Sequence, residues 1–180
     1  KKYYCHTMID EKIIFTPINI AVLTISDTRS KDNDKSGSYL SKSINEKGHS
    51  CTYHGVIKDD PSQIINTVKE LSLKKEIDVI ITTGGTGLTG RDNTIDNIKS
   101  ISEIEIPGFG ELFRQISFQK IGTSAIQSRS SAFLVNKTYV FCLPGSKSAV
   151  QDAWKEILFY QLDIRHKPCN FVELIPRLDE

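Results

Sequence analysis

The stretch that decides the fold is Val79-Ile80-Ile81-Thr82-Thr83-Gly84-Gly85-Thr86-Gly87-Leu88-Thr89-Gly90-Arg91-Asp92. It opens with an apolar, β-branched run that suits a buried strand and is too short for a separate helix. Four glycines then follow within seven positions. Glycine permits positive φ and lets a ligand approach main-chain N–H groups, which together can form a concave anion site. The stretch therefore predicts a strand followed by a phosphate-binding loop; the alternative is a glycine-rich turn that only reverses the chain.

Outward from this strand, the chain alternates predicted strands and helices. We expect strands over about 18–25, 51–57 and 77–83, and helices over about 36–47, 61–74, 95–100, 111–118, 124–128 and 149–162. A hairpin is expected at 131–135 and 138–143, joined by Asn136-Lys137. Alternation gives parallel strands with right-handed crossovers, and the hairpin makes the sheet mixed. The predicted fold class is α/β with three layers: a mostly parallel open sheet, helices on both faces and an antiparallel hairpin near one edge.

Local signals predict where several of these elements begin or end. Asp60-Pro61 with Gln63 is a strong helix start, and Gly48 is a suitable helix stop. Ser148 with Gln151 predicts the capping box of the last helix. Three further signals are a helix cap at Thr94, a turn at Ile104–Gly110 and strand character at 168–174.

The bulk composition is that of an ordinary globular domain. Of the 180 residues, 38% are hydrophobic and 25% are charged, and the net charge is +1. A chain of this length can bury a sizeable core as one domain. The small net charge gives no electrostatic footprint for nucleic acid, and no apolar run approaches the span of a bilayer. We therefore expect neither nucleic acid nor a membrane as a partner.

The chain divides into an N-terminal arm, residues 1–16, and a single α/β domain, residues 17–180, which includes the C-terminal tail. The arm has weak periodicity and suits packing on a partner subunit. The first residues lack the apolar region of a signal peptide. The cysteines are scattered without a C-x-x-C pair, which favours reduced thiols in a cytoplasmic protein; they are Cys5, Cys51, Cys142 and Cys169.

Four predicted loops follow strand C-termini and should meet at one edge of the sheet. They are Ser26-Asp27, the loop at Asp59, Gly84–Asp92 and Pro144-Gly145-Ser146. Ligands of open α/β sheets bind at this edge. Backbone donors there suit phosphate, and carboxylates beside phosphate suit Mg²⁺. The set is typical of phosphoryl or nucleotidyl transfer, in which catalysis is mostly positioning and charge neutralisation.

Each acidic residue of this set also has a purely structural interpretation. Asp60 is accounted for as a helix cap, which leaves Asp59 as the more interesting carboxylate, although a solvated loop residue is the alternative. Asp92 could cap the next helix, and Asp27 could make an Asx turn. We interpret Arg91, Arg114 and Arg129 as solvated or interface residues and not as substrate clamps.

Two other site types fit the sequence less well. Gly85–Gly90 matches G-x-G-x-x-G, the signature of a dinucleotide-binding oxidoreductase, but it follows the third strand and does not run directly into a long helix. His49, Cys51 and His54 are close in sequence, but strand burial and surface polarity explain them better than a zinc site.

The motifs taken together resemble the MoaB/MogA family of molybdenum cofactor biosynthesis proteins. The similar segments are Thr24–Asp27, Thr82–Asp92, Ile106–Arg114, Ile121–Ala125 and Leu143–Ser146. The tail Pro168-Cys169-Asn170-Phe171 and the N-terminal arm resemble the MoaB branch. The resemblance covers the chain from about Thr16 to Pro176.

The resemblance implies an α/β fold, a homotrimer or homohexamer, and work alongside other molybdenum cofactor biosynthesis proteins. It implies adenylyl transfer from Mg-ATP to molybdopterin, giving adenylyl-molybdopterin and pyrophosphate. Carried onto this chain, Asp59 and Asp92 would be the catalytic carboxylates and would hold Mg²⁺. The nucleotide would bind Ser26, Asp27, Ser36, Gly37, Thr83, Gly84, Gly85, Thr86 and Gly87. The pterin or its phosphate would bind Pro144, Gly145 and Ser146.

One departure from the family pattern leaves two functions open. Arg-Asp-Val-Thr-Pro-Glu is frequent in the family, whereas this chain has Arg91-Asp92-Asn93-Thr94-Ile95-Asp96 and so loses a proline that pre-sets a helix start. Both Asp59 and Asp92 are present, which favours a competent enzyme. The alternative is a non-catalytic molybdopterin- or nucleotide-binding member of the same pathway.

Overall fold

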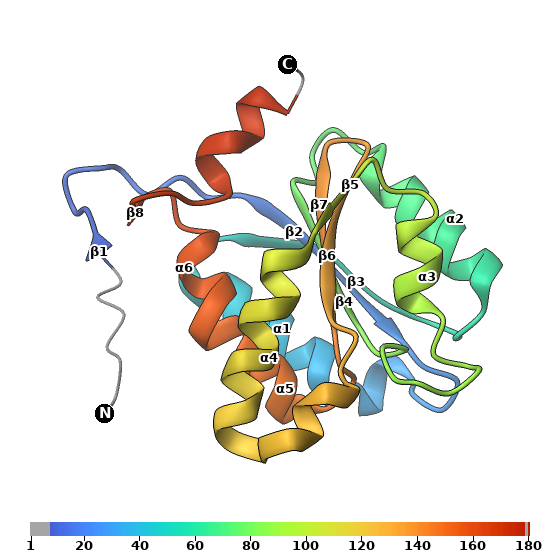
Figure 1. The fold of residues 1–180 in the computed structure, drawn as a ribbon. Coiled ribbons are helices and arrows are strands. Elements are labelled where there is room, and N and C mark those ends of the chain that lie inside the picture. Colours follow the sequence, from blue (N-terminus) through green and yellow to red (C-terminus); the bar gives the residue numbers. More distant parts are fainter. Residues whose placement is uncertain (1–7, 179) are drawn as a thin grey trace.

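A six-stranded mixed sheet forms the centre of the molecule, with strand order β3-β2-β4-β7-β6-β5 (Figure 1). The computed structural model describes residues 8–178 and 180. The strands are β2 Asn19–Ile25, β3 Ser50–Ile57, β4 Val79–Thr83, β5 Ile104–Ile106, β6 Ser131–Val135 and β7 Thr138–Leu143. The four strands from β3 to β7 in this order are parallel, whereas β6 and β5 are antiparallel to their neighbours. The predicted fold class is confirmed.

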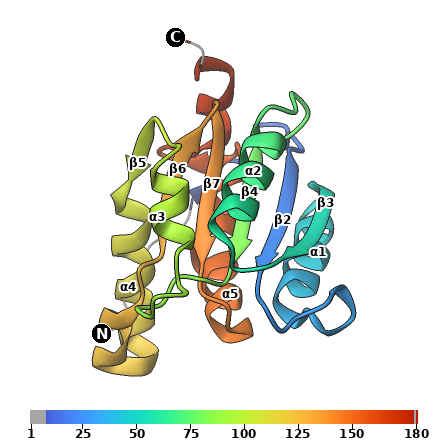
Figure 2. The same cartoon turned by 90° about the vertical axis from the view of Figure 1, so that its right-hand side faces the viewer.

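Helices cover both faces of this sheet. Those of eight or more residues are α1 Lys35–Lys47, α2 Pro61–Ser72 and α4 Pro107–Ile121; shorter ones are α3 Thr94–Lys99, α5 Lys147–Ala153 and α6 Phe159–Gln161. Five π-helical residues, Trp154–Leu158, join α5 to α6. Turns of 3-10 helix occupy Lys31–Asn33, Gly122–Gln127 and Val172–Arg177. Helices α2 and α3 lie on one face, and α1, α4 and α5 lie on the other (Figure 2).

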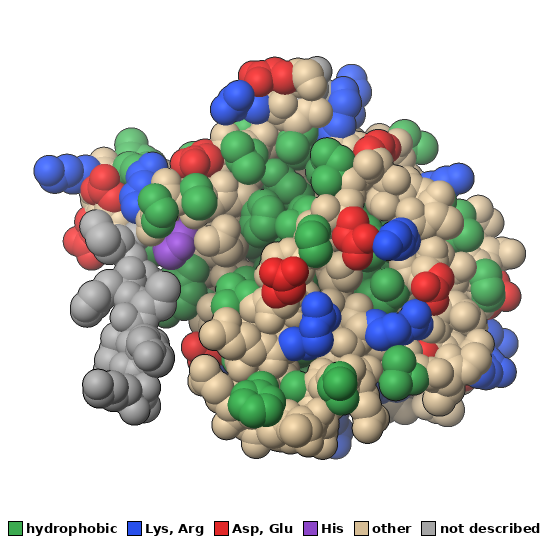
Figure 3. Space-filling model, viewed as in Figure 1, with side chains coloured by type: hydrophobic (Ala, Val, Ile, Leu, Met, Phe, Trp, Pro, Cys, Tyr) green, Lys and Arg blue, Asp and Glu red, His purple; other side chains and the backbone are tan. Residues whose placement is uncertain are grey.

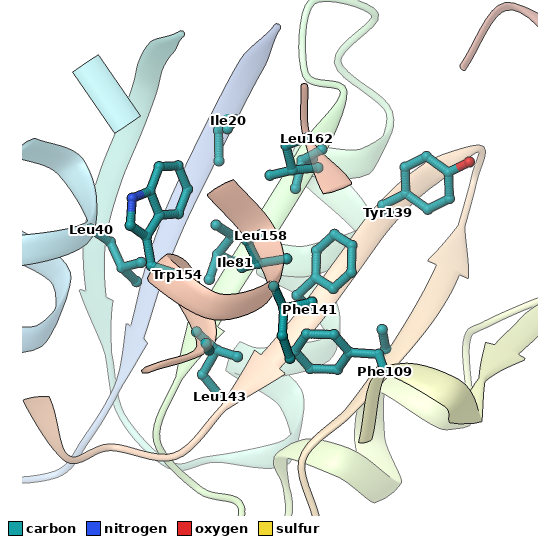
Figure 4. Close-up of a cluster of buried hydrophobic side chains, with 14 of the residues drawn as sticks. Ile20, Leu40, Ile81, Phe109, Tyr139, Phe141, Leu143, Trp154, Leu158 and Leu162 are labelled. Carbon is teal, nitrogen blue, oxygen red and sulfur yellow. The ribbon is translucent and has the colours of Figure 1, made fainter. Parts of the chain in front are cut away.

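Two apolar layers result, because alternate residues of each strand point to opposite faces. Ile20 and Val22 of β2 pack in the layer with α1, α4 and α5, whereas Ala21 and Leu23 pack in the layer with α2 and α3. The first layer is rich in aromatic side chains, including Phe109, Tyr139, Phe141 and Trp154, shown together in Figure 4. Since both faces are covered, the central strands read as continuous apolar runs.

Several predicted element ends are confirmed. The Asp60 carboxylate accepts a hydrogen bond from the Gln63 N–H at 2.9 Å, with Pro61 in the first turn of α2. Gly48 ends α1 with a left-handed φ of 100°. The hairpin turn is at Asn136-Lys137, with φ values of 47° and 66°, although Lys137 is an unusual residue at positive φ.

Four local predictions are wrong. Ser146, not Ser148, caps α5 by accepting from the Ala149 N–H at 3.3 Å. Thr94 is the first residue of α3 and makes no cap. The segment Ile104–Gly110 is not a turn: Ile104–Ile106 pairs with β6 and α4 begins at Pro107. The 168–174 tail runs into the 3-10 helix Val172–Arg177 instead of a strand.

The glycines and the proline of 104–110 suggested a turn, but Pro107 and Gly110 are both compatible with the helical positions that they occupy. Pro107 occupies the first turn of α4, where a missing N–H costs nothing. Gly110 lies inside the helix because a Cβ there would be 2.3 Å from the Ser130 carbonyl oxygen. These residues therefore permit close packing of α4 against the start of β6.

The described part of the N-terminal arm contacts its own chain. β1, Met8–Ile9, pairs antiparallel with β8, His166–Lys167. The Phe15 ring lies on His49 with a centroid distance of 4.9 Å. Residues 1–7, including Cys5, lie outside the described part. Cys51, Cys142 and Cys169 are free thiols. No helix of the described residues is long and apolar enough to cross a membrane.

The two histidines in and beside β3 have structural contacts, and the described residues contain no group of three or more His, Cys, Asp or Glu side chains arranged to hold a metal. His54 Nε2 lies 2.9 Å from Asp34 Oδ2. His49 is buried, and its Nδ1 accepts a hydrogen bond from the Ile18 N–H at 3.2 Å. Burial and, to a smaller extent, the charge of Lys47 together lower the pKa of His49 to about 4, against the opposing charge of Asp163.

We predict that His49 makes stability depend on pH in mildly acidic solution. Its pKa is depressed on folding, so its contribution is present above the unfolded value of 6.5 and is lost as the pH falls to about 4. Over that window, the free energy of unfolding should fall by on the order of 2 kcal/mol more in the native protein than in His49→Gln. Urea unfolding at a series of pH values measures this, and parallel curves for the two proteins would contradict it.

Candidate functional site

The four predicted loops do meet at one edge of the sheet, beyond the C-terminal ends of β2, β3, β4 and β7. The Asp59 N–H donates to Asp27 Oδ1 at 3.3 Å, which joins the loops after β2 and β3. The Gly84 N–H donates to the Leu143 carbonyl at 3.0 Å, and Thr83 Oγ1 donates to the Pro144 carbonyl at 2.9 Å. These bonds join the glycine loop to the loop after β7.

The glycine loop, defined here as Gly84–Asp92, begins with two residues that only glycine suits. Gly84 has a φ of 111°, and a Cβ there would lie 2.1 Å from the Ile25 carbonyl oxygen. Gly85 has a φ of 64°, and its Cβ would lie 2.1 Å from Thr94 Oγ1. At both positions, positive φ together with a close neighbouring atom excludes a side chain. The first glycines therefore let the chain leave β4 sharply against the end of β2.

A cleft of about 330 Å³ opens over this loop. It is lined by Gly84, Gly85, Thr86, Gly87, Asp92, Gln127, Ser128, Pro144 and Gly145. A larger hollow, of about 600 Å³, lies between α1 and residues 154–165 and is walled by aromatic and long charged side chains. We take the smaller cleft as the site because it combines flexible main chain, hydroxyls and a carboxylate, which is the chemistry a phosphate ligand requires.

Asp59 has a carboxylate in which one oxygen lacks a hydrogen-bond partner in the described part of the chain. Its Oδ1 atom is buried and has no hydrogen-bond partner among the described residues. Burial raises the pKa of Asp59, and the neighbouring charges of Asp27 and Asp92 raise it further, against the opposing effect of Arg91. An unpaired carboxylate oxygen beside two more carboxylates is suited to a hard cation such as Mg²⁺. The chemistry of Asp59 and Asp92 therefore fits two residues that would hold a divalent cation.

Asp92 differs from Asp59 because hydrogen bonds from the protein hold its carboxylate. Its Oδ2 accepts from the Thr89 hydroxyl at 2.6 Å and from the Thr89 N–H at 3.0 Å. The Thr89 hydroxyl is the largest cause that lowers the pKa of Asp92, and it outweighs the cost of burial. Asp92 is thus a fixed, ionised carboxylate at the rim of the cleft. Because its side chain bonds within the loop, it does not cap α3.

Ser26 and Asp27 organise the loop after β2. Ser26 Oγ accepts from the Thr28 N–H at 3.3 Å and from the Arg29 N–H at 3.2 Å. The Asp27 side chain is partly exposed and makes an ion pair with Arg91 of the glycine loop. This ion pair joins the loop after β2 to the glycine loop. Asp27 therefore contacts both of the other loops that carry a candidate carboxylate, the loop at Asp59 and the glycine loop.

Ser36 and Gly37 lie behind the loop after β7. Ser36 Oγ donates to the Gly145 carbonyl at 2.9 Å, and Arg29 Nη2 donates to the same oxygen at 2.9 Å. The Gly37 N–H donates to Asp34 Oδ1 at 2.9 Å, so it is already used at the start of α1. The structure thus places Ser36 at the site as a support for Gly145, and gives Gly37 a packing role.

Known proteins with similar sequences identify the family to which this chain belongs. The sequence model of the family described as "Probable molybdopterin binding domain" matches residues 21–164. The chain belongs to this family. Molybdenum cofactor biosynthesis protein B of Escherichia coli is 41% identical over 157 residues, which is 87% of this chain and 92% of that protein. The protein of the same name from Bacillus cereus is 40% identical over 146 residues, which is 81% and 86% of the two chains.

Solved structures agree with this assignment to the molybdopterin-binding domain family. A crystal structure of molybdenum cofactor biosynthesis protein B has a TM-score of 0.82 at 36% identity, covering 91% of this chain and 97% of that one. The tungsten cofactor synthesizing protein MoaB of Pyrococcus furiosus has a TM-score of 0.72 at 32% identity, covering 82% and 96%. The resemblance to the MoaB branch is confirmed.

Sequence reasoning missed three features of this family member's site. Gln127 and Ser128 line the cleft, and nothing in the 124–128 pattern indicated more than a short helix. Arg29 donates a hydrogen bond to the Gly145 carbonyl. Its position in the chain directly after Ser26–Thr28 was a signal that could have placed it in the predicted site. Arg129, interpreted as solvated or at an interface, bonds to the glycine loop instead.

We predict that Gly84→Ala destabilises this domain far more than Gly90→Ala. The first substitution forces an L-residue to positive φ with its Cβ against a carbonyl oxygen, which should cost about 2–4 kcal/mol of unfolding free energy. A Cβ at Gly90 would have no atom within 4 Å, and its cost should stay within about 0.5 kcal/mol. Guanidinium unfolding of both variants decides the point, and equal costs would refute the close approach at Gly84.

Proposed function

We propose that this chain acts in molybdenum cofactor biosynthesis and transfers the adenylyl group of ATP to molybdopterin. The observation that carries the proposal is the contact between the Gly84–Gly87 cradle and Asp59: a Cβ on Gly85 would lie 3.3 Å from Asp59 Oδ2, and the buried Oδ1 of Asp59 lacks a partner among the residues described. Membership of the molybdopterin-binding domain family and relatives named for molybdenum cofactor biosynthesis support it.

In the proposed reaction, a terminal phosphate oxygen of molybdopterin forms a bond to the α-phosphorus of ATP. The bond from that phosphorus to the bridging oxygen of the β-phosphate breaks, and pyrophosphate leaves with the electron pair. The products are adenylyl-molybdopterin and pyrophosphate. The protein has little covalent chemistry to perform, so rate enhancement comes from positioning and from neutralising phosphate charge.

The residues of the cleft divide this work. Gly85–Gly87 let main-chain N–H groups approach phosphate oxygens. Pro144 and Gly145 form the facing wall, where we place the pterin phosphate. Asp59 and Asp92 would hold Mg²⁺, which when bound supplies positive charge to the phosphate oxygens. Asp59 stays available for that role because no donor of the described residues occupies its Oδ1 atom.

We predict that Asp59→Asn abolishes adenylyl transfer, whereas the adjacent Asp60→Asn does not. Pyrophosphate release from molybdopterin, ATP and Mg²⁺ should fall by about 100-fold or more in Asp59→Asn, because a buried ligand of the cation is lost. Asp60→Asn makes the same charge change but keeps a good helix cap, so its rate should stay within about two-fold.

Stability supplies an internal check on the same variants. Without Mg²⁺, Asp59→Asn should unfold at a temperature equal to or above that of the native protein, because it removes repulsion from Asp27 and Asp92. Loss of turnover in a stable variant therefore reports on chemistry and not on folding. If the native protein binds molybdopterin and nucleotide but releases no pyrophosphate, its function is binding without catalysis in the same pathway.

We also propose that the chain self-associates through α4 and the 3-10 turn after it. Phe118 and Ile126 are 58% and 84% exposed there, and Ile121 is exposed beside them. Hydrophobic side chains are visible over this part of the surface in Figure 3. Phe118, Ala125 and Ile126 line one groove on this surface, and an exposed apolar groove of this kind suits a second copy of this chain.

The oligomeric state tests this surface. Light scattering should give a homotrimer or a homohexamer for the native chain, and Phe118→Lys should shift it to smaller species by placing charge in an apolar contact. Leu73→Asp changes an exposed apolar residue after α2, at the other edge of the molecule, and should leave the mass unchanged. A monomeric native chain, or a loss of assembly in Leu73→Asp alone, would contradict the proposed surface.

A further inference from the structure

We propose that Arg129 is a positioning residue that fixes the glycine loop and Asp92 in the orientation that the cleft requires. The inference rests on the proposed function for its catalytic consequence, but its structural part stands without that function. Arg129 lies between the 3-10 turn Gly122–Gln127 and β6, and its side chain is 31% exposed. It does not line the cleft, whereas its neighbours Gln127 and Ser128 do.

Arg129 makes four hydrogen bonds to one segment of chain. Its main-chain N–H donates to the Thr86 carbonyl at 3.3 Å. Its guanidinium donates to the Gly87 carbonyl at 2.9 Å, to the Asp92 carbonyl, and to Asp96 Oδ2 at 2.8 Å. The planar fork of arginine can hold several acceptors in fixed directions, which lysine cannot do. One residue therefore ties both ends of the glycine loop to the start of α3.

These bonds determine which way the loop peptides face. The Gly85 carbonyl accepts from the Thr94 N–H at 3.1 Å, so with Thr86 and Gly87 three successive carbonyls bond to the body of the protein. In a trans peptide the next N–H points opposite to the carbonyl. Holding the carbonyls of Thr86 and Gly87 on the Arg129 side therefore turns the following amides to the other side.

The Asp92 carboxylate, unlike its main-chain carbonyl, lies on that other side. A Cβ on Gly87 would be 2.7 Å from Asp92 Oδ2, so the carboxylate packs directly against the loop backbone. The Gly87 backbone is also among the groups that keep the pKa of Asp92 low, with the charge of Arg129 as a smaller contribution. The loop is thus clamped between a guanidinium behind it and a carboxylate in front. Releasing the guanidinium should free both the amides and Asp92.

The test compares Arg129→Gln and Arg129→Lys with Arg114→Gln. Arg114 is a matched control because it also donates to backbone carbonyls, those of Ser128 and Ser130 at 3.5 and 3.0 Å, but its side chain makes no hydrogen bond to the described residues of the glycine loop. Arg129→Lys keeps the charge and loses the fork, so it separates geometry from electrostatics and preserves the fold if Arg129→Gln does not.

Two readouts are taken on each protein. Amide hydrogen exchange over 84–92 without any ligand should quicken by about 10-fold in both Arg129 variants and stay unchanged in Arg114→Gln. In the adenylyl-transfer assay, kcat should fall by about 30-fold or more in Arg129→Gln with a smaller change in KM, because the loop is misplaced.

The outcomes separate this inference from the proposed function. Quicker loop exchange in the Arg129 variants, in a native protein that transfers no adenylyl group, would support the clamp and refute the function. Normal loop exchange and normal kcat in both Arg129 variants, in a native protein that does turn over, would overturn the clamp alone. An equal effect of Arg114→Gln would also overturn it, because support of the backbone near β6 would then explain the result.

Discussion

The contact between the backbone of Gly84 and the Ile25 carbonyl oxygen is the constraint on which the site depends. β2 and β4 run parallel with Thr24 opposite Thr83, so both strands end at the same height and their loops compete for the same space. Only a residue without Cβ can pass the Ile25 carbonyl, where a Cβ would lie at 2.1 Å. Once the chain has passed, the Gly84 N–H reaches the Leu143 carbonyl and draws in the loop after β7. The cleft is therefore a consequence of strand register and of one missing side chain.

The site also shows how a stable scaffold can hold an unfavourable arrangement of charge. Asp92 and Asp34 have their carboxylates satisfied by hydrogen bonds, and their pKa values are lowered. Asp59 differs in two ways. Burial and its acidic neighbours raise its pKa, and one of its carboxylate oxygens has no hydrogen-bond partner among the residues that the structure describes. Apolar layers on both sheet faces supply the stability that tolerates this repulsion. An arrangement that costs stability without a ligand and gains from a bound cation is typical of a binding site.

Much of this could be predicted from sequence, because the signals were local and periodic. The apolar runs of β2, β4 and β7, the Asp60 cap and the meeting of four loops all follow from strand alternation and cap chemistry. The sequence predictions failed where contacts with other parts of the chain determine the local structure. Gly110 is helical because Ser130 packs against it, and Ser146 displaces Ser148 as a cap because β7 ends where it does. Arg129 acts on a loop that lies 37 residues earlier in the chain, and no local pattern could indicate its partners.

A crystal structure with Mg²⁺ and ADP, in which the two phosphates can occupy the cleft, tests the central claim most directly. Phosphate oxygens are expected at hydrogen-bond distance, about 3 Å, from main-chain nitrogens of Gly85–Gly87. A cation is expected about 2.1 Å from an Asp59 oxygen and bonded to phosphate. Phosphates bound away from the glycine loop, with Asp59 still without a cation, would contradict the account.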